Sequence, residues 1–163
     1  MCDIHVNKFI LEDCQMLCTA HSEFGTWRDG MYKPTHVNHP CNVWIRESKG
    51  NYNWVLAHLC ELIQEKMYRT GKLHATSRII KYVSYPPEKM PGFDEYDGLM
   101  TEPPQCMPEE HKRPDVRDAY RNYYNAKMIE WVTRDKPIIP KWTGRDVPHS
   151  VKDAVKQATG VEL

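Results

Sequence analysis

The feature that most constrains the fold is a long stretch, from residue 4 to about residue 24, that contains no proline or glycine. Because Asp3 is a plausible N-cap directly before it, the stretch predicts a long α-helix. Apolar residues spread over most of the circumference of this helix, so we expect it to be buried nearly all round. Together with the helices described below, it predicts a mainly α fold.

A single narrow polar stripe runs along the predicted helix 4–24. Its residues follow one another at alternating steps of three and four, which confines them to a sector of about 80°. They are His5, Lys8, Glu12, Gln15 and Thr19. Because a helix that is apolar elsewhere has little surface to give to water, the stripe favours the lining of a cleft. The alternative is the solvated face of an ordinary amphipathic helix.

Caps, prolines and glycines delimit the other helices of a fold with about five helices in all. They cover residues 40–70, 74–83, 115–132 and 148–159. Within 40–70, Gly50 predicts a kink or a break into two helices with Asn51 as the new cap, and Gly71 ends the stretch. Residues 85–114 hold most of the 12 prolines and are expected to form a loop or lid. We expect 1–163 to be a single compact helical domain, which fits its length.

The charge balance limits how the chain can bind nucleic acid. Lys plus Arg and Asp plus Glu are both 22, so the formal net charge is +0. The chain therefore lacks the overall positive charge of a protein that is held to DNA by phosphate contacts alone. Any contact with DNA must come from a local basic patch. Bases gather in 64–89 and 127–156, whereas 94–118 is acidic. Apolar runs are far shorter than the ~20 residues that span a bilayer, so no membrane partner is expected.

Cysteine usage indicates a reducing compartment. The 6 cysteines form no CxxC pair, and Cys14, Cys18 and Cys60 lie inside helical patterns, where buried thiols are common. We therefore expect free thiols, no structural zinc and a protein of the cytoplasm.

Lys8 and Glu12 are the candidate catalytic pair of the polar stripe, with His5 one turn before them. They stand at i and i+4, close enough to form an ion pair. An acid beside an amine can transfer protons, and a desolvated lysine can form a Schiff base. The same pairing is also the commonest structural salt bridge on helices. The catalytic interpretation loses its main support if the stripe is exposed to solvent and lies away from His36 and His39.

The segment that precedes the helix at residue 40 holds His36, Asn38 and His39. A helix N-terminus can bind a phosphate or carboxylate, and two histidines there can donate hydrogen bonds or move protons. Asn38 or His39 can equally act as a simple cap, and Cys41 beside His39 allows a Cys–His nucleophile. A metal site would combine His36 and His39 with His5 or His21 and with Glu12 or Glu47, but its spacing matches no zinc signature, so no metal or cofactor is expected.

One face of the helical stretch 40–70 alternates aromatic and polar residues. Its members are Trp44, Glu47, Asn51, Trp54 and His58. The two tryptophans are candidates for a wall that stacks on a base, with Asn51 reading the base edge, although such residues are more often core. Arg69 and Lys72 near the end of the stretch are candidate phosphate contacts, or ordinary partners of the helix dipole.

The motifs resemble a family of small proteins that is common in tailed bacteriophages. The resemblance rests on CDIHVNK at 2–8, LE at 11–12, CQML at 14–17 and YKPTHVNHPC at 32–41, and it extends through Trp44, Trp54 and Tyr68–Arg69 to Tyr123–Tyr124. It covers most of the chain. Some members carry the label pyrimidine-dimer DNA glycosylase. The family has a lysine where this chain has Ile4, and a strand-like segment before the first box.

These patterns together predict a phage-type enzyme that acts on DNA or nucleotides in the host cytoplasm, most concretely a DNA base-excision glycosylase and lyase. Lys8, or an N-terminal amine at Met1 or Cys2, would attack C1′, and Glu12 would direct protons. Trp44 and Trp54 would hold the extruded base, while Arg69 and Lys72 would contact the backbone. The alternatives are a protein that binds a host nucleotide signal at His36 and His39 without catalysis, or a hydrolase or transferase of free nucleotides.

Overall fold

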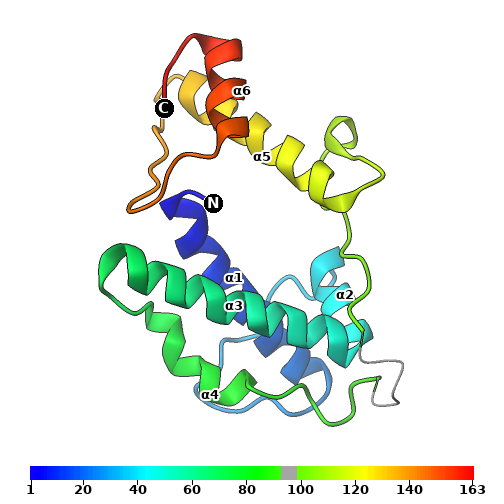
Figure 1. Cartoon of the computed structure of the whole chain (residues 1–163). Helices are drawn as coiled ribbons and strands as arrows, with labels where there is room; N and C mark the ends of the chain where they lie inside the picture. Colours follow the sequence, from blue (N-terminus) through cyan, green and yellow to red (C-terminus); the bar gives the residue numbers. More distant parts are fainter. Residues whose placement is uncertain (93–98) are drawn as a thin grey trace. The chain divides into compact units, whose positions relative to one another are not determined.

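The computed structural model describes residues 1–92 and 99–163, and its regular structure is helical, which confirms the mainly α prediction (Figure 1). The described residues contain no strand. The α-helices are α1 (Asp3–Glu23), α2 (Pro40–Glu47), α3 (Lys49–Thr70), α4 (Ile80–Val83), α5 (Val116–Thr133) and α6 (His149–Thr159). Two 3-10 turns, η1 (Ala75–Ile79) and η2 (Glu109–His111), precede α4 and α5. No described helix combines the length and apolarity needed to cross a membrane.

Local capping explains most helix ends. His39 caps α2, and Pro40 occupies the first helical position, as predicted. Asp115 caps α5 by accepting the N–H groups of Arg117 at 2.8 Å and Asp118 at 3.2 Å. Gly71 and Gly160 end α3 and α6 in the left-handed conformation, with φ of 66° and 72°, where a residue without a Cβ is favoured.

The break inside 40–70 is real, but the prediction that Asn51 caps the second helix is wrong. Ser48 is the cap: its backbone is extended, and its Oγ accepts the N–H of Asn51 at 3.1 Å. Asn51 therefore stands three residues inside α3. Gly50 lies in the first turn of α3, where backbone N–H groups have no intrahelical partner, so it does not weaken a helix interior.

The burial of α1 differs from the prediction in its N-terminal half. Ile4 is 46% exposed and Leu11 is 36% exposed, so α1 is not buried all round. The second half is buried more continuously and includes the polar residues Asp13, Thr19 and His21. Periodicity shows which residues share a face, but not whether each apolar residue finds a partner, and single exposed apolar side chains are normal.

Contacts divide the chain into two compact units, which we describe separately. The N-terminal unit is His5–Pro104, and the C-terminal unit combines Met1–Ile4 with Gln105–Leu163. The prediction that 1–163 forms one domain stays a prediction. Of the predicted proline-rich loop or lid 85–114, residues 93–98 lie outside the described residues, and the rest contains no regular structure except η2.

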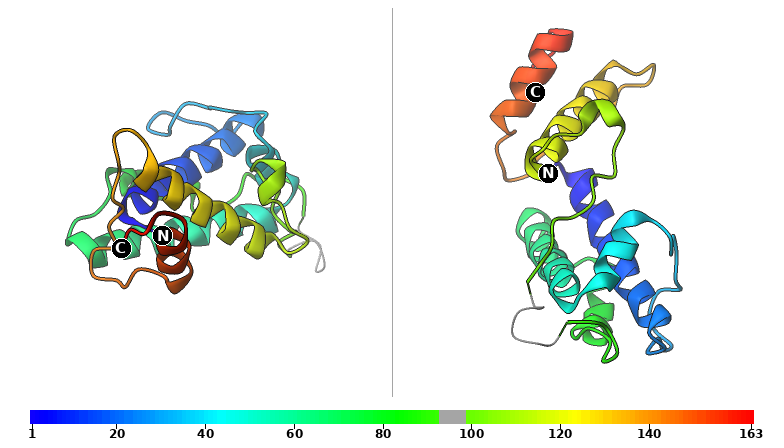
Figure 2. Two further views of the ribbon diagram at one scale, coloured as in Figure 1. Left: turned by 90° about the horizontal axis from the view of Figure 1, so that it is seen from above. Right: turned by 90° about the vertical axis from the view of Figure 1, so that its right-hand side faces the viewer.

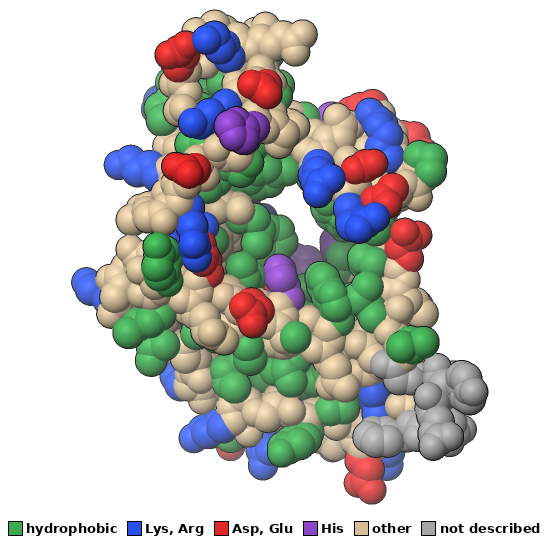
Figure 3. All heavy atoms as spheres, in the orientation of Figure 1, with side chains coloured by type: hydrophobic (Ala, Val, Ile, Leu, Met, Phe, Trp, Pro, Cys, Tyr) green, Lys and Arg blue, Asp and Glu red, His purple; other side chains and the backbone are tan. Residues whose placement is uncertain are grey.

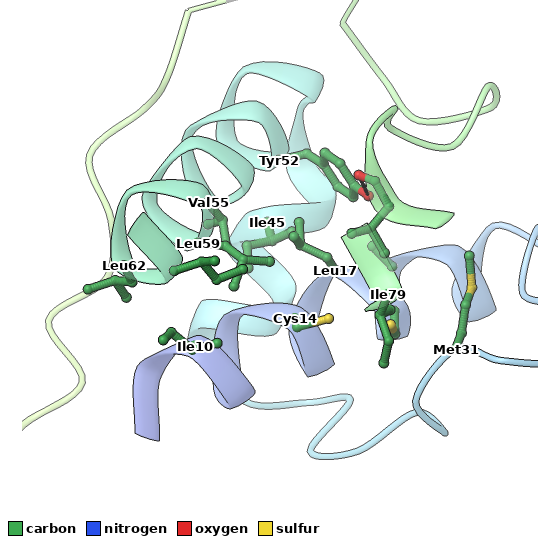
Figure 4. Close-up of a cluster of buried hydrophobic side chains, with 14 of the residues drawn as sticks. Ile10, Cys14, Leu17, Met31, Ile45, Tyr52, Val55, Leu59, Leu62 and Ile79 are labelled. Atoms are coloured by element: carbon green, nitrogen blue, oxygen red, sulfur yellow. Dashed lines mark hydrogen bonds between the residues drawn. The ribbon is translucent and has the colours of Figure 1, made fainter. Parts of the chain in front are cut away.

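In the N-terminal unit, α1 and α3 pack against each other through apolar side chains (Figure 4). Ile10, Cys14 and Leu17 come from α1, and Val55, Leu59 and Leu62 come from α3. In the C-terminal unit, α5 and α6 lie side by side (Figure 2). They enclose a second core made of Cys2, Met128, Val132, Trp142, Val151 and Val155.

Candidate functional site

The interface of α1 and α3 holds a carboxylate and an imidazole that the sequence analysis did not connect. Asp13 lies on α1, and His58 lies on α3, 45 residues away in the chain. Asp13 Oδ2 and His58 Nδ1 are 2.8 Å apart. The Asp13 side chain is 5% exposed, whereas that of His58 is 31% exposed. A buried acid thus contacts one nitrogen of a ring that reaches solvent.

Helix packing explains why Asp13 is buried. Its neighbour Cys14 and the adjacent Ile10 belong to the apolar face of α1 that packs on α3. A carboxylate in such a place is costly unless a partner satisfies it, and His58 is that partner. Burial raises the pKa of the Asp13 carboxyl above its ordinary 3.8, while the hydrogen bond to His58 opposes this effect.

The hydrogen bond also fixes which ring nitrogen of His58 is basic. An ionised Asp13 can only accept, so Nδ1 carries the proton and Nε2 keeps its lone pair. In the described part of the chain, no hydrogen bond reaches Nε2. This is the arrangement of a general base: a buried acid orients the imidazole, and the second nitrogen is left for a substrate or water.

One tryptophan, Trp54, adjoins His58, and a second, Trp44, adjoins Trp54. The Trp54 ring stacks on the His58 ring with centroids 5.3 Å apart and planes inclined by 15°. Trp44, from α2, meets Trp54 edge-on at 6.0 Å. Trp54 is 43% exposed, but Trp44 is only 6% exposed. On the face seen in Figure 3, hydrophobic side chains and histidine lie together over α3. Trp54 therefore offers indole surface to a ligand, while Trp44 supports it from behind.

Asn51 and Thr101 hold Trp44 in place. Asn51 is fully buried, and its Nδ2 donates to the Trp44 carbonyl at 2.8 Å and to Thr101 Oγ1 at 3.0 Å. Its Oδ1 accepts the Thr101 N–H at 2.8 Å. The indole N–H of Trp44 donates to the same Thr101 hydroxyl at 2.9 Å. Asn51, which the sequence predicted as a reader of base edges, thus uses its amide to brace the aromatic pair.

The predicted catalytic pair of Lys8 and Glu12 lies on the surface. The Lys8 ammonium and the Glu12 carboxylate are 3.4 Å apart, and the two side chains are 58% and 40% exposed. No burial desolvates the lysine. His5, one turn earlier, tilts against Phe9 with ring centroids 6.0 Å apart, and Gln15 is half-buried. The geometry therefore gives Lys8 no support as a desolvated nucleophile.

The polar stripe meets the His36 segment only at its far end. Thr19 Oγ1 accepts the Thr35 N–H at 3.2 Å, and Thr35 Oγ1 is 2.8 Å from His36 Nδ1. Lys8 is about 16 Å along the helix from Thr19, at 1.5 Å per residue. The two groups of candidate residues, Lys8 with Glu12 and His36 with its neighbours, are thus separate.

The helix start at residue 40 is built mainly by capping. His39 Nδ1 accepts the N–H of Cys41 at 3.2 Å. His36 has a left-handed backbone, with φ of 47°, and Asn42 donates to its carbonyl at 2.9 Å. Asn38 is exposed. These contacts cap the helix start and do not bring His36 or His39 to the Asp13–His58 pair.

The remaining predicted binding residues are dispersed. The side chain of Arg69 is 5% exposed, and its Nε and Nη2 donate to Glu65 Oε1 at 2.8 and 2.6 Å. Lys72 and Glu47 are exposed. Arg69 is thus occupied by an acid of its own helix, and it has little surface to offer a phosphate.

A buried histidine, His21, serves the core. His21 Nε2 lies 3.0 Å from the Tyr52 hydroxyl, which itself donates to the Val83 carbonyl at 2.8 Å. The His21 ring must therefore donate from Nε2, and Nδ1 faces Thr26 Oγ1 at 2.8 Å. Burial, and after it the positive charge of Arg28, lowers the pKa of His21, which favours the neutral ring. Both nitrogens are used, which separates this histidine from His58.

Sequence reasoning placed His58 on the face of Trp54 but did not find Asp13. One signal existed: Asp13 is an acid outside the polar stripe, on a sector of α1 that is otherwise apolar. Such a residue requires a buried partner. The identity of the partner depends on how α1 and α3 pack.

Comparison of the chain with known protein families, curated proteins and solved structures finds no match. The resemblance to the bacteriophage family stays a prediction that rests on its sequence motifs.

Proposed function

We propose that the protein is a hydrolase of nucleic acid or nucleotides, with His58 as the general base that activates water. The observation that carries this proposal is the 2.8 Å contact between the buried Asp13 carboxylate and a partly exposed imidazole that also stacks on Trp54. Hydrolytic base excision is its most concrete form.

The chemistry needs only groups of this chain and water. His58 Nε2 takes a proton from a water molecule, whose oxygen forms a bond to C1′ of the nucleoside while the bond from C1′ to the base nitrogen breaks. The electron pair of that bond leaves with the base. The proton on His58 is then available to the departing base, and the Asp13 carboxylate stabilises the transient imidazolium. General-base catalysis of this kind contributes roughly 10²–10⁴-fold.

Two features favour a nucleobase as the group that is bound. The exposed indole of Trp54 stacks on the His58 ring. Stacking of a nucleobase on an aromatic side chain contributes about 1–3 kcal/mol per nucleobase. The sequence motifs resemble a family with members labelled as DNA glycosylases. This proposal replaces the amine nucleophile by water, because Lys8 is exposed and paired with Glu12.

The test is a substrate panel with two matched variants. Duplex oligonucleotides that carry a thymine dimer, a deaminated base or an abasic site are incubated with the protein, alongside free nucleosides and nucleotides. Base release is measured by chromatography, and borohydride trapping reports any covalent adduct. We expect base release without an adduct, loss of release in His58→Gln, and normal release in Lys8→Gln.

The other outcomes are informative. An adduct that Lys8→Gln removes would overturn the water mechanism and restore the lyase interpretation. If no substrate turns over, but nucleotides quench tryptophan fluorescence in the normal protein and not in Trp54→Leu, the protein is a nucleotide-binding protein. That second function is favoured by the exposure of Trp54 alone.

A further inference from the structure

A second surface of the N-terminal unit gathers two cations around one aromatic ring. The guanidinium carbon of Arg28 lies 5.3 Å from the centroid of the Tyr82 ring. The ammonium of Lys81 lies 4.8 Å from the same centroid. Arg28 belongs to the loop after α1, and Tyr82 and Lys81 belong to α4, which lies beside this loop (Figure 1). Two like charges thus share one aromatic ring.

The loop that carries Arg28 is fixed against α4. Gly30 has φ of 99°, a conformation that favours glycine, and a Cβ added to it would lie 2.8 Å from the Tyr82 hydroxyl. Trp27 donates its indole N–H to the Tyr32 carbonyl at 2.9 Å. The Tyr32 hydroxyl in turn lies 2.9 Å from Thr76 Oγ1. The two cations are therefore presented by a braced loop and a helix.

The charges on this surface are not neutralised. Arg28 and Lys81 are exposed, and neither forms an ion pair with a residue of the described ranges 1–92 and 99–163. Asp29 is exposed beside Arg28 but makes no ion pair with it. Cations that form no ion pair within the protein can attract a polyanion, because each phosphate that they neutralise releases a counterion.

Two exposed aromatic residues stand close to these cations in the sequence, Trp27 directly before Arg28 and Tyr85 four residues after Lys81. Trp27 is 37% exposed, and Tyr85, just after α4, is 81% exposed. We define Trp27, Arg28, Lys81, Tyr82 and Tyr85 as the cationic aromatic surface. A groove or face that combines cations for phosphates with rings for base stacking is typical of proteins that bind single strands.

We propose that the cationic aromatic surface binds single-stranded nucleic acid. Bases of a single strand can leave the stack and contact Trp27 and Tyr85, while their phosphates contact Arg28 and Lys81. A duplex keeps its bases stacked and offers only phosphates to this surface. The inference goes beyond the proposed hydrolysis, because it concerns other residues and is measured by binding without turnover.

The experiment is a titration of a fluorescently labelled oligothymidine of about 20 nucleotides, longer than one site of ~4–16 nucleotides, with the full chain. Anisotropy is recorded from about 50 to 200 mM salt, so that the salt dependence of the affinity is obtained. The charge variant is Arg28→Gln with Lys81→Gln. The matched control is Lys136→Gln with Lys152→Gln, which removes the same charge from exposed positions of the C-terminal unit.

We expect the charge variant to bind at least about tenfold more weakly. The slope of log affinity against log salt concentration should fall by about 1.4, which is about 0.7 for each of the two phosphate contacts that are lost. The control variant should bind normally. Tyr85→Ala should weaken binding about fivefold with an unchanged salt slope, since stacking does not release counterions. The matching duplex should bind at least about tenfold more weakly than the single strand.

Equal losses in the charge variant and in the control would overturn the proposal, because binding would then follow net charge. Equal affinity for duplex and single strand would overturn the single-strand preference. Displacement of the oligonucleotide by polyglutamate at equal charge would show a surface for acidic peptides instead. Tyr85→Ala changes only an exposed side chain, so it keeps the proposal testable even if the charge variant unfolds.

Discussion

Two acid–base pairs on neighbouring positions of α1 show how burial changes the chemistry of the same groups. Glu12 pairs with Lys8 on the surface, where water screens the interaction and such pairs contribute about 0.3–0.5 kcal/mol. Asp13, the next residue, is turned by about 100° around the helix and is buried against His58. The exposed pair is ordinary, whereas the buried pair sets the tautomer of a histidine. Two adjacent residues of one helix thus belong to a surface salt bridge and to a candidate catalytic site.

The largest effect should come from replacing the base. His58→Gln removes the basic nitrogen while keeping a polar side chain of similar length, so base release should fall at least about 100-fold. Lys8→Gln should change it less than about twofold, since the lysine is exposed and does not contact the site. Steady-state kinetics on the best substrate of the panel gives both ratios. A larger loss in Lys8→Gln would reverse the comparison.

Replacing the buried acid should separate activity from stability. Asp13→Asn keeps an acceptor for His58 Nδ1 but no charge to stabilise the imidazolium, so activity should fall about tenfold. Burial raises the pKa of Asp13, so its stabilising contribution is complete below pH 3.8 and is lost as the pH rises through the folded pKa. At pH 8 the variant should therefore melt at the same temperature or at a higher one. Each 1 kcal/mol of added stability raises the melting temperature by roughly 2–4 °C.

Glu12→Gln is the matched control for that experiment. It removes an acid from the adjacent, exposed position and should change neither activity nor the melting temperature measurably. Both variants can be followed by circular dichroism and by the substrate assay. A drop in melting temperature of Asp13→Asn at pH 8 would show that the charged pair stabilises the fold.

A third experiment extends the comparison to buried and exposed histidines. Burial lowers the pKa of His21 in the folded protein below its ordinary 6.5. As the pH falls through 6.5, His21 is therefore protonated first in the unfolded chain, and the folded state loses stability until the pH reaches the folded pKa. The loss can reach about 1.4 kcal/mol per pH unit. His21→Gln can keep both hydrogen bonds and should flatten this dependence in denaturant titrations between pH 7.5 and 5.

The exposed His36 provides the control for the His21 experiment. His36→Asn suits its left-handed backbone and leaves the core unchanged, so the pH dependence of stability should stay as in the normal protein. If His36→Asn flattens the curve as much as His21→Gln does, burial is not the cause.

The smallest effect should be the coupling within the exposed pair. A double-mutant cycle of Lys8→Ala and Glu12→Ala should give a coupling free energy below about 0.5 kcal/mol, and about 1 M salt should remove it. Thermal unfolding at low and high salt supplies the measurement. A salt-resistant coupling above about 1 kcal/mol would mean that the pair is shielded from water, contrary to its exposure.

The fold could be predicted further than the site. Asp115, Gly71 and Gly160 mark helix ends through contacts within one turn, so the sequence indicated the bounds of α3, α5 and α6 closely. The cap of α3 shows the limit of such contacts. Gly50 led to the prediction of a cap at Asn51, but the Ser48 side chain is the acceptor that caps the helix. Capping is local, and local contacts can be recognised from neighbouring residues.

For the site, the sequence indicated Trp44, Trp54 and His58 as one face but assigned the chemistry to Lys8 and Glu12. Spacing alone can show that Lys8 and Glu12 meet, because they share a helix. It cannot show that Asp13 meets His58, since that contact joins residues 45 positions apart. It also cannot show that the amide of Asn51 is used by Thr101.

The sequence by itself therefore determined where the chain is helical, where most helices end and which residues share a helix face. These properties follow from backbone geometry and from contacts within one turn. Only the tertiary structure decided which face of α1 packs on α3. That packing buried Asp13, left Glu12 in water and made His58 the basic group, because the cost of burying a charge depends on the surroundings and not on the residue type.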